Sequence, residues 1–246
     1  MEQATQQIIA ELDLYKNDEK ASFLPRFFKT GKGEYGEGDL FIGIVVPDIR
    51  KVAKAHRQAS LNSLHELLQS PVHEYRMVAL FILTDHFERE KEEKKQAEYV
   101  RFYIDHVDAI NNWDLVDLSC YKLLGRWLEK REKTLLYDWA KTDHLWKQRI
   151  AMVSCMHFVR NHQFDDTLAI ADILLYHPHD LIHKAVGWIL REAGKKDREV
   201  LTAYLLPRYR EMPRTMLRYA IEHFPEPERK QFLLGTMHLQ QTDNEK

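Results

Sequence analysis

The pattern of hydrophobic and polar positions is helical along nearly the whole chain. Apolar residues recur at spacings of three and four, and no strand-like alternation extends over six residues. Capping residues such as Asn112 and Asp180 stand at many of the predicted helix starts. The predicted helices begin near Glu2, Lys20, Val46, Leu61, Val72, Lys95, Asn112, Thr134, Asp143, Phe164, Asp180, Asp197 and Pro213. The pattern therefore predicts an all-α fold.

A weak internal repeat indicates how these helices are arranged. Four segments place a cation before a short run of small and apolar residues. They begin at Arg76, Arg149, Lys184 and Arg218, with gaps of 73, 35 and 34 residues. Such a period is typical of an α-solenoid, in which helical hairpins stack into a curved body with a concave surface. We expect one domain over residues 1–246, with a disordered tail over about residues 238–246.

Composition narrows the class of protein. Apolar residues make up 44% of the 246 positions, enough for a sizeable core, and only 9 Gly and 8 Pro are present, too few for a turn-rich β fold. Cys120 and Cys155 lie in separate apolar runs, which predicts buried free thiols. The longest apolar run, Met77–Leu83, is far shorter than the roughly 20 residues that cross a bilayer. We expect a soluble, cytoplasmic protein.

Charge is distributed unevenly. The net charge of −2 is weak evidence for a nucleic-acid-binding protein, because such domains are usually basic. Residues 147–218, however, contain 12 Lys and Arg against 8 Asp and Glu, a net +4, so the rest of the chain carries −6. This asymmetry points to a local anion site in the C-terminal half.

The predicted helix over Asp180–Lys195 carries an unusual face. At about 100° per residue, Trp188, Arg191 and Lys195 all lie within about 40° of Lys184, opposite the apolar stripe. One interpretation is a Trp packed under the next repeat, with long cationic side chains around it. The alternative is an aromatic and cationic face that binds a nucleic-acid backbone.

A second unusual pattern lies between Asn112 and Glu129. Trp113 and Asp117 are spaced i, i+4 and share one face of the predicted helix. The apolar residues Cys120, Leu124 and Leu128 are expected on that face too, which places a carboxylate in apolar surroundings. Arg149 is likewise a charge in a helix that is apolar nearly all round. Because an unpaired buried charge is costly, these two residues form either a structural ion pair or part of a cleft.

Two further features carry weaker signals. The glycine-rich segment Thr30–Asp39 lacks the Lys-Ser/Thr of a phosphate-binding loop, so we expect a mobile loop. His179 and His183 are spaced i, i+4 and lie close to His177, which would allow a metal site. No metalloprotease pattern accompanies these histidines, and we predict no metal and no cofactor.

The chain resembles the AlkD-like DNA alkylation repair glycosylases, which are built from HEAT-like repeats. The matching segments are Asn112–Asp117 (NWDLVD), Trp146–Arg149 (WKQR), Lys184–Glu192 (KAVGWILRE) and Asp39–Arg50 (DLFIGIVVPDIR), and they run over most of the chain. The resemblance implies an α-solenoid of HEAT-like repeats with a concave basic face.

The resemblance also assigns roles. It implies that Asp117 is the catalytic carboxylate, that Trp113 and Trp188 are two aromatic residues of the cleft, and that Arg149 contacts backbone phosphate. DNA contacts are expected from the following cations: Arg149, Lys184, Arg191, Lys195 and Arg218. The chain departs from the family at two positions, because Asn112 stands where some members have an aromatic residue and Phe27 where a tyrosine is expected.

The implied activity is excision of positively charged N3- and N7-alkylpurines from duplex DNA by a monofunctional, monomeric enzyme. Asp117 would stabilise an oxocarbenium-like transition state and orient water. Two alternatives remain: a DNA-binding repeat protein without catalytic activity, and a protein-interaction scaffold. A base-release assay separates the first alternative from the enzyme, and DNA affinity separates the second.

Overall fold

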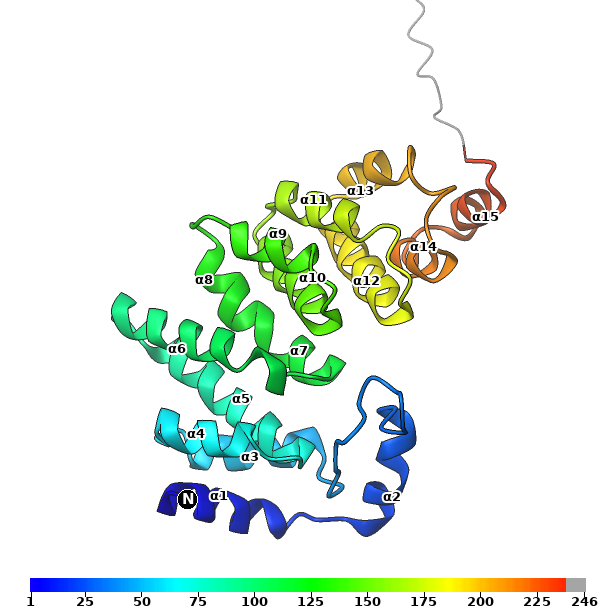
Figure 1. The fold of residues 1–246 in the computed structure, drawn as a ribbon. Coiled ribbons are helices and arrows are strands. Elements are labelled where there is room, and N and C mark those ends of the chain that lie inside the picture. Colours follow the sequence, from blue (N-terminus) through cyan, green and yellow to red (C-terminus); the bar gives the residue numbers. More distant parts are fainter. Residues whose placement is uncertain (238–246) are drawn as a thin grey trace, which may run out of the picture. The chain divides into compact units, whose positions relative to one another are not determined.

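The computed structural model describes residues 1–237, and its regular elements are all helices (Figure 1). The tail expected to be disordered, residues 238–246, lies outside the described residues. Within them, the all-α prediction is confirmed. No helix of residues 1–237 is both long enough and apolar enough to span a membrane.

The helices follow one another through short connections, with one longer loop between α2 and α3. Their bounds are α1 Gln3–Asp13, α2 Asp18–Phe27, α3 Val46–Ala55, α4 Leu61–Leu68, α5 His73–Arg89, α6 Glu93–Asp105, η1 Val107–Ala109 (3₁₀), α7 Trp113–Cys120, η2 Tyr121–Gly125 (π), α8 Arg126–Leu128, α9 Thr134–Ala140, α10 Leu145–Arg160, α11 Asp165–Ile173, α12 Asp180–Lys196, α13 Arg198–Leu205, α14 Arg214–Ala220 and α15 Glu226–Leu234.

The predicted helix starts agree closely with these bounds. Helices begin at Val46, Leu61, Thr134 and Asp180, as predicted, and the other predicted starts fall within two residues of an observed one. The sequence analysis missed α15, whose first turn contains a proline. Proline is tolerated there because the first helical N–H groups have no partner within the helix.

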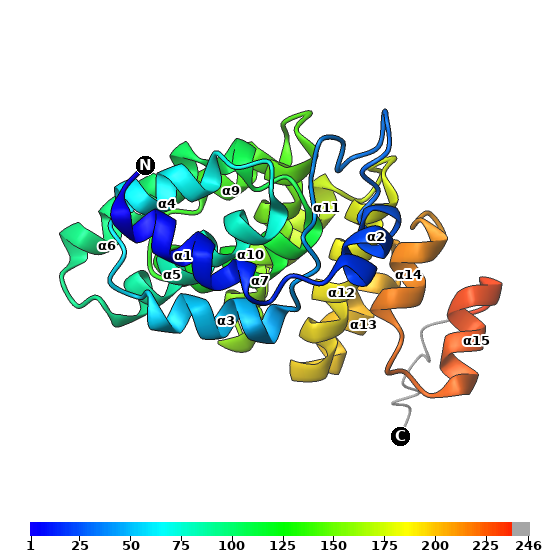
Figure 2. The ribbon, with the colours of Figure 1, turned by 90° about the horizontal axis from the view of Figure 1, so that it is seen from below.

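Contacts within the chain divide it into two compact units, unit 1 (Met1–Trp127) and unit 2 (from Leu128 onward). Unit 1 is built around α5, which is buried on all sides from His73 to Thr84, as its apolar run Met77–Leu83 requires. Helices α3 and α4 pack against α5, and α1 packs on both of them (Figure 2). Helices α6 and α7 also contact α5, so one buried helix organises the whole unit.

Unit 2 consists of two helical layers. Helices α10, α12 and α14 pack successively against one another, while α9, α11 and α13 pack along this row. The repeated segments that begin at Arg149, Lys184 and Arg218 lie in α10, α12 and α14, so the period in the sequence corresponds to one helical pair. This confirms a helical-repeat fold. The curvature and the basic concave face remain predictions.

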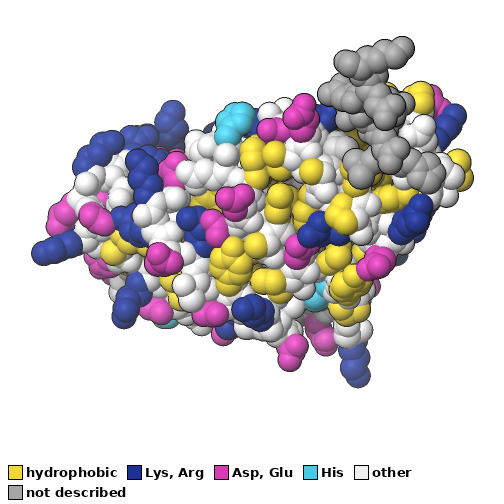
Figure 3. Space-filling view, turned by 90° about the horizontal axis from the view of Figure 1, so that it is seen from above, with side chains coloured by type: hydrophobic (Ala, Val, Ile, Leu, Met, Phe, Trp, Pro, Cys, Tyr) yellow, Lys and Arg dark blue, Asp and Glu magenta, His cyan; other side chains and the backbone are white. Residues whose placement is uncertain are grey.

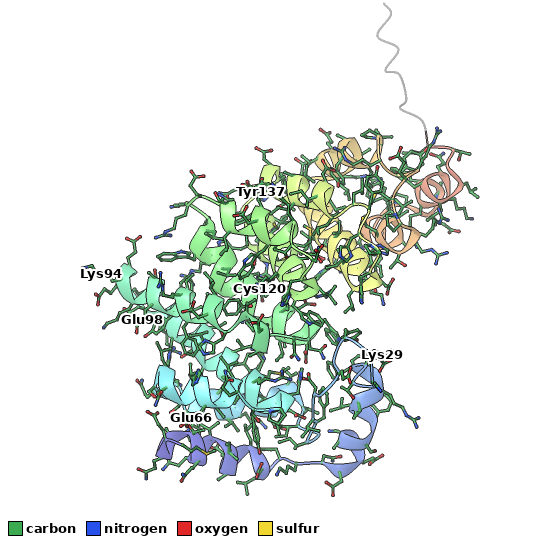
Figure 4. All side chains as sticks on the ribbon, in the orientation of Figure 1. Lys29, Glu66, Lys94, Glu98, Cys120 and Tyr137 are labelled. Atoms are coloured by element: carbon green, nitrogen blue, oxygen red, sulfur yellow. The ribbon has the colours of Figure 1, made fainter. Side chains whose placement is uncertain are left out.

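Both cysteines are buried free thiols, as the sequence predicted. Burial raises the pKa of the Cys155 thiol to about 12, which keeps it protonated and unreactive. Figure 4 shows Cys120 among the helices of unit 1, whereas Lys94 and Glu98 of α6 are exposed. The two cysteine side chains therefore contribute to the packing of the core.

A close approach between α12 and α14 yields a test of this packing. A Cβ atom on Gly187 of α12 would lie 2.5 Å from the carbonyl oxygen of Met216 and 2.5 Å from Cβ of Tyr219, both in α14. Gly187→Ala should lower the free energy of unfolding by about 1–3 kcal/mol, despite a gain of about 1 kcal/mol in helix propensity. Urea unfolding followed by circular dichroism measures the change.

The matched control is Gly194→Ala in the same helix. There the nearest atom is Cδ2 of the Leu201 side chain, which can move. We expect a smaller loss of stability or none. Equal losses for the two variants would contradict the proposed backbone contact between α12 and α14.

Candidate functional site

Helix α7 carries two of the predicted site residues. Its N-cap, Asn112, is buried, and Asn112 Oδ1 accepts a hydrogen bond from the Trp113 N–H at 2.9 Å. Trp113 and Asp117 lie one turn apart on the helix, and both are half-buried. Asp114 is buried, whereas Asp117 of the same helix is only half-buried. Asp117 thus keeps access to solvent.

The helix changes form directly after α7. Tyr121–Gly125 is a π-helical segment, which has more residues per turn than an α-helix. The predicted common face of Asp117, Leu124 and Leu128 is therefore wrong beyond Cys120, because the face rotates within the π-helix. Leu124 and Leu128 are buried, in contrast to Asp117. Such rare segments occur frequently at functional sites.

The indole of Trp113 belongs to a row of aromatic rings. It stacks on Phe28 at 5.2 Å between centroids with an interplanar angle of 12°, and Phe27 contacts it edge-on at 5.7 Å. Phe28 in turn stacks on Phe41 at 4.7 Å. Phe27, the residue at the expected tyrosine position, is 53% exposed. The row therefore runs from a solvent-exposed ring into the core of unit 1.

A buried charge network that the sequence analysis missed lies beneath this row. His73 is the first residue of α5, and its side chain is 2% exposed. Its Nε2 lies 2.9 Å from Asp114 Oδ2, and its Nδ1 lies 3.2 Å from Asp39 Oδ2. Since carboxylates only accept, both ring nitrogens donate, and His73 is an imidazolium.

Arg76 and Asn111 complete the network. Arg76 Nη2 lies 2.6 Å from Asp39 Oδ1, and Arg76 Nη1 donates to Asn111 Oδ1 at 2.6 Å. Asn111 Nδ2 donates to Asp39 Oδ1 at 3.1 Å. The loop before α3, the first turn of α5 and the segment before α7 are therefore joined by charged hydrogen bonds.

The pKa values of the network follow from burial and neighbouring charge. Burial alone would lower the pKa of His73, but the carboxylates of Asp114 and Asp39 outweigh it and raise this pKa to about 9. Burial would raise the pKa of Asp39, but the hydrogen bond from His73 and the charge of Arg76 hold it below its usual range. His73 and Asp39 are therefore both charged at neutral pH.

Backbone contacts fix the segment that carries Asp39. The Leu40 N–H donates to the Pro71 carbonyl at 2.9 Å, and the His73 N–H donates to the Leu40 carbonyl at 2.8 Å. The buried Glu74 carboxylate accepts the N–H groups of Ile42, Gly43 and Ile44. Asp39 is therefore held at the start of α5 from both sides.

The glycine-rich loop is folded into turns by its own carboxylates. The Gly31 N–H donates to Glu34 Oε2 and the Gly33 N–H donates to Glu37 Oε2, each at 2.8 Å. A Cβ on Gly36 would lie 2.6 Å from the Phe28 carbonyl oxygen, so only glycine fits this close approach. The mobility of the glycine-rich loop remains a prediction.

The other predicted residues lie in unit 2. Arg149 of α10 is buried, and its Nη1 donates to the Leu181 carbonyl at 2.6 Å, at the start of α12. Trp188 is half-buried on α12, whereas Ile182, Val186 and Ile189 form the buried stripe. The prediction that the core of this helix excludes Trp188 is confirmed.

Acidic side chains accompany three of the predicted DNA-binding cations. Lys184 Nζ lies 2.7 Å from Asp180 Oδ2, and Lys195 Nζ lies 2.8 Å from Glu192 Oε1. Arg191 pairs with Glu222 and Glu192. Figure 3 shows acidic and basic side chains interspersed over the face that it displays. A phosphate would have to compete with these carboxylates.

Arg218 of α14 differs from those three cations, because it is exposed and has no ion pair with residues 1–237. Among the predicted cations, it is therefore the most accessible to an anion. Trp113 and Asp117 belong to unit 1, and the predicted cations and Trp188 belong to unit 2.

The three clustered histidines make local hydrogen bonds. His179 Nδ1 accepts from the Leu181 N–H at 3.1 Å, and His177 Nδ1 accepts from the His179 N–H at 3.0 Å. His183 Nε2 donates to the His177 carbonyl. No group of three His, Cys, Asp or Glu side chains in residues 1–237 is arranged to hold a metal ion. These histidines cap the start of α12.

The family model for "DNA alkylation repair enzyme" matches residues 8–224. The chain belongs to the DNA alkylation repair enzyme family. This confirms the resemblance inferred from the four sequence segments. No curated protein matches the chain.

Two solved structures share the fold of this DNA alkylation repair family member. A predicted DNA alkylation repair enzyme from Enterococcus faecalis is similar over 86% of this chain and 97% of its own, with a TM-score of 0.64 and 17% identity. AlkD2 from Streptococcus mutans is similar over 84% of this chain and 98% of its own, with a TM-score of 0.54 and 15% identity. At these identities the likeness concerns the fold.

Raising the pH through about 9 should destabilise this family member. The pKa of His73 is raised from 6.5 to about 9 on folding, so its contribution to stability is complete below about pH 6.5 and is lost as the pH rises through about 9. At about 1.4 kcal/mol per pKa unit, the contribution is at most about 3–4 kcal/mol.

Urea unfolding at about pH 6 and about pH 10 measures this contribution in the wild type and in His73→Gln. Because the variant lacks the titrating group, the difference in stability between the two proteins should shrink as the pH rises. A difference that stays constant over this range would contradict the assigned charge state of His73.

Proposed function

We propose that this DNA alkylation repair enzyme is a monofunctional DNA glycosylase that releases positively charged N3- and N7-alkylpurines from duplex DNA. The observation that carries the proposal is a partly exposed carboxylate, Asp117, one helical turn from Trp113 in a chain of this family. We also propose that the enzyme acts as a cytoplasmic monomer without a cofactor.

The chemistry needs one carboxylate because the leaving group is already cationic. When the bond between C1′ and N9 breaks, its electron pair neutralises the alkylpurine, so no acid has to protonate the base. The deoxyribose becomes an oxocarbenium-like cation, which the negative charge of Asp117 stabilises. In an ordinary glycoside the departing oxygen must be protonated as the bond breaks, and glycosidases use two carboxyl groups, one of them as this acid.

Asp117 has a second role in the hydrolysis. A water molecule forms the new C–O bond at C1′ and loses a proton, which the Asp117 carboxylate accepts. The partial exposure of Asp117 admits this water, as a buried carboxylate would not. The products are a neutral alkylpurine and an abasic site.

The aromatic residues are assigned to the sugar. Trp113, supported by Phe28 and edge-on by Phe27, offers an electron-rich ring to the developing cation. Trp188 of unit 2, outside the apolar stripe of α12, is proposed for the same role. Asn112, which stands where some family members have an aromatic residue, is buried as a helix cap and offers no ring to the sugar.

The cations of unit 2 are proposed to bind backbone phosphates. Arg218 is exposed, whereas Lys184, Arg191 and Lys195 must exchange a carboxylate for a phosphate. Arg149, which is buried and bonded to the Leu181 carbonyl, is held in a fixed orientation for one phosphate. Phosphate contacts fix the position of the duplex and carry no sequence preference.

Asp117→Asn tests the catalytic role directly. The amide keeps the shape of the side chain but lacks its charge, so base release should fall at least about 100-fold while duplex affinity changes little. The measurement is single-turnover release of 7-methylguanine, together with the dissociation constant for the same duplex. The control is Asp85→Asn, another half-buried acid of unit 1, which should leave both values unchanged.

Other outcomes would favour the alternatives. Wild-type protein that binds methylated duplex but releases no base would be a DNA-binding repeat protein without activity. Wild-type protein without affinity for DNA would be an interaction scaffold. Excision by Asp117→Asn at the wild-type rate would contradict the assignment of Asp117.

Glu222→Gln tests whether acidic partners limit DNA binding. The pKa of Glu222 is lowered by its ion pair with Arg191. Loss of this carboxylate frees Arg191 Nη1 for phosphate, while Arg191 Nε keeps its pair with Glu192. Duplex affinity should therefore rise about three-fold at low salt, and the gain should shrink as salt is added. Fluorescence anisotropy at several salt concentrations measures both effects.

The matched control is Glu228→Gln, which frees Arg198, a cation outside the predicted set. It changes the net charge by the same amount, so any general electrostatic gain appears in both variants. Equal gains for Glu222→Gln and Glu228→Gln would contradict a specific role for Arg191.

A further inference from the structure

We propose that His73 is a positioning residue, which holds the start of α7 so that Trp113 and Asp117 keep the geometry that base excision requires. This inference rests on the glycosylase function proposed above. His73 does not need to touch DNA, because its connections to α7 pass through the backbone and through a stack of rings.

The backbone connection passes through Asp114. Asp114 Oδ2 accepts from His73 Nε2 at 2.9 Å, while Asp114 Oδ1 accepts from the Leu115 N–H at 2.8 Å. One carboxylate therefore ties the first turn of α7 to the first residue of α5. Asp114 follows Trp113 directly in the chain. A displacement of His73 would therefore shift the backbone from which the Trp113 side chain extends.

The second connection passes through aromatic rings. The centroid of the His73 imidazole lies 5.1 Å from the centroid of the Phe28 ring. The imidazole also stacks on the Phe41 ring, with 4.6 Å between the centroids. Phe28 in turn stacks on the Trp113 indole. The backbone and the side chain of Trp113 are thus both supported by the same imidazolium.

Stability alone does not explain why a charged histidine occupies this buried position. Burying an imidazolium between Asp39 and Asp114 carries a desolvation cost, and an apolar side chain of similar size often stabilises such a position equally well. What the charged pair adds is direction, because each donor of His73 meets one oxygen. Directional bonds fix the rotation of α7 about its axis, and Asp117 lies one turn from Trp113 on that helix.

The first test is spectroscopic and needs no enzymatic activity. The protein contains five Trp residues, so 5-fluorotryptophan labelling resolves them by ¹⁹F NMR, and Trp113→Phe assigns the Trp113 signal. His73→Gln removes the imidazolium, and Asp39→Asn weakens its other anchor. We expect the Trp113 resonance to shift or broaden in both variants.

The control is His56→Gln, which removes another histidine–carboxylate pair of unit 1. His56 Nε2 lies 2.7 Å from Glu11 Oε2, between α3 and α1. This variant should lose stability without moving the Trp113 resonance. A Trp113 resonance that moves equally in the control, or in neither network variant, would overturn the proposal.

The second test separates positioning from binding. In His73→Gln and Asp39→Asn, the single-turnover rate of base release should fall about ten-fold or more, while the duplex dissociation constant stays within about two-fold. If His73→Gln does not fold, Asp39→Asn carries the test.

A moved Trp113 resonance with an unchanged rate would overturn the positioning role. Wild-type protein that releases no base would refute the glycosylase function, and the resonance test would still show whether His73 orients Trp113.

Discussion

A charge that leaves water must find a partner of opposite sign, and this constraint determines how α7 begins. Asp39, His73, Asp114 and Arg76 are all buried, and each is stable there because the others are present. The four residues come from the loop before α3, from α5 and from α7. The segment that carries Trp113 and Asp117 is therefore fixed by residues distant in the sequence.

The same constraint distinguishes two acids on one short helix. Asp114 is buried and committed to His73, whereas Asp117, three residues later, remains partly exposed. A carboxylate that must meet a water molecule and a sugar cation needs this exposure. The neighbouring acids of α7 therefore differ in access to solvent, and the catalytic role proposed for Asp117 depends on this difference.

In unit 2 the surface charges are balanced locally. Lys184, Arg191 and Lys195 each have a carboxylate partner, so the net positive charge of this region is weaker in effect than its composition indicates. Exposed pairs of this kind contribute little to stability, about 0–1 kcal/mol each. In the proposed function, these ion pairs instead determine how strongly the cations attract a phosphate and how strongly this attraction depends on the salt concentration.

The sequence predicted the fold better than the chemistry. Helix starts such as Val46 and Asp180 follow from local caps and periodicity, and the position of Trp188 outside the core follows from a helical projection. The resemblance carried in four short segments identified the family.

The failures of prediction have physical causes. Asp39, His73 and Asp114 are far apart in the sequence, and no spacing indicates that two carboxylates meet one imidazole. The weak signal available was a histidine followed by the long apolar run of α5. The helical projection from Asp117 failed beyond Cys120 because the π-helical segment has no clear sequence pattern.

Direct detection of both reaction products tests the central claim. A duplex with one N7-methylguanine is incubated with excess wild-type enzyme and a metal chelator, and its products are analysed by mass spectrometry. The account predicts that free 7-methylguanine and the abasic strand accumulate in equal amounts, with no strand cleavage. A modified strand that stays intact while the protein is bound to it would contradict the account.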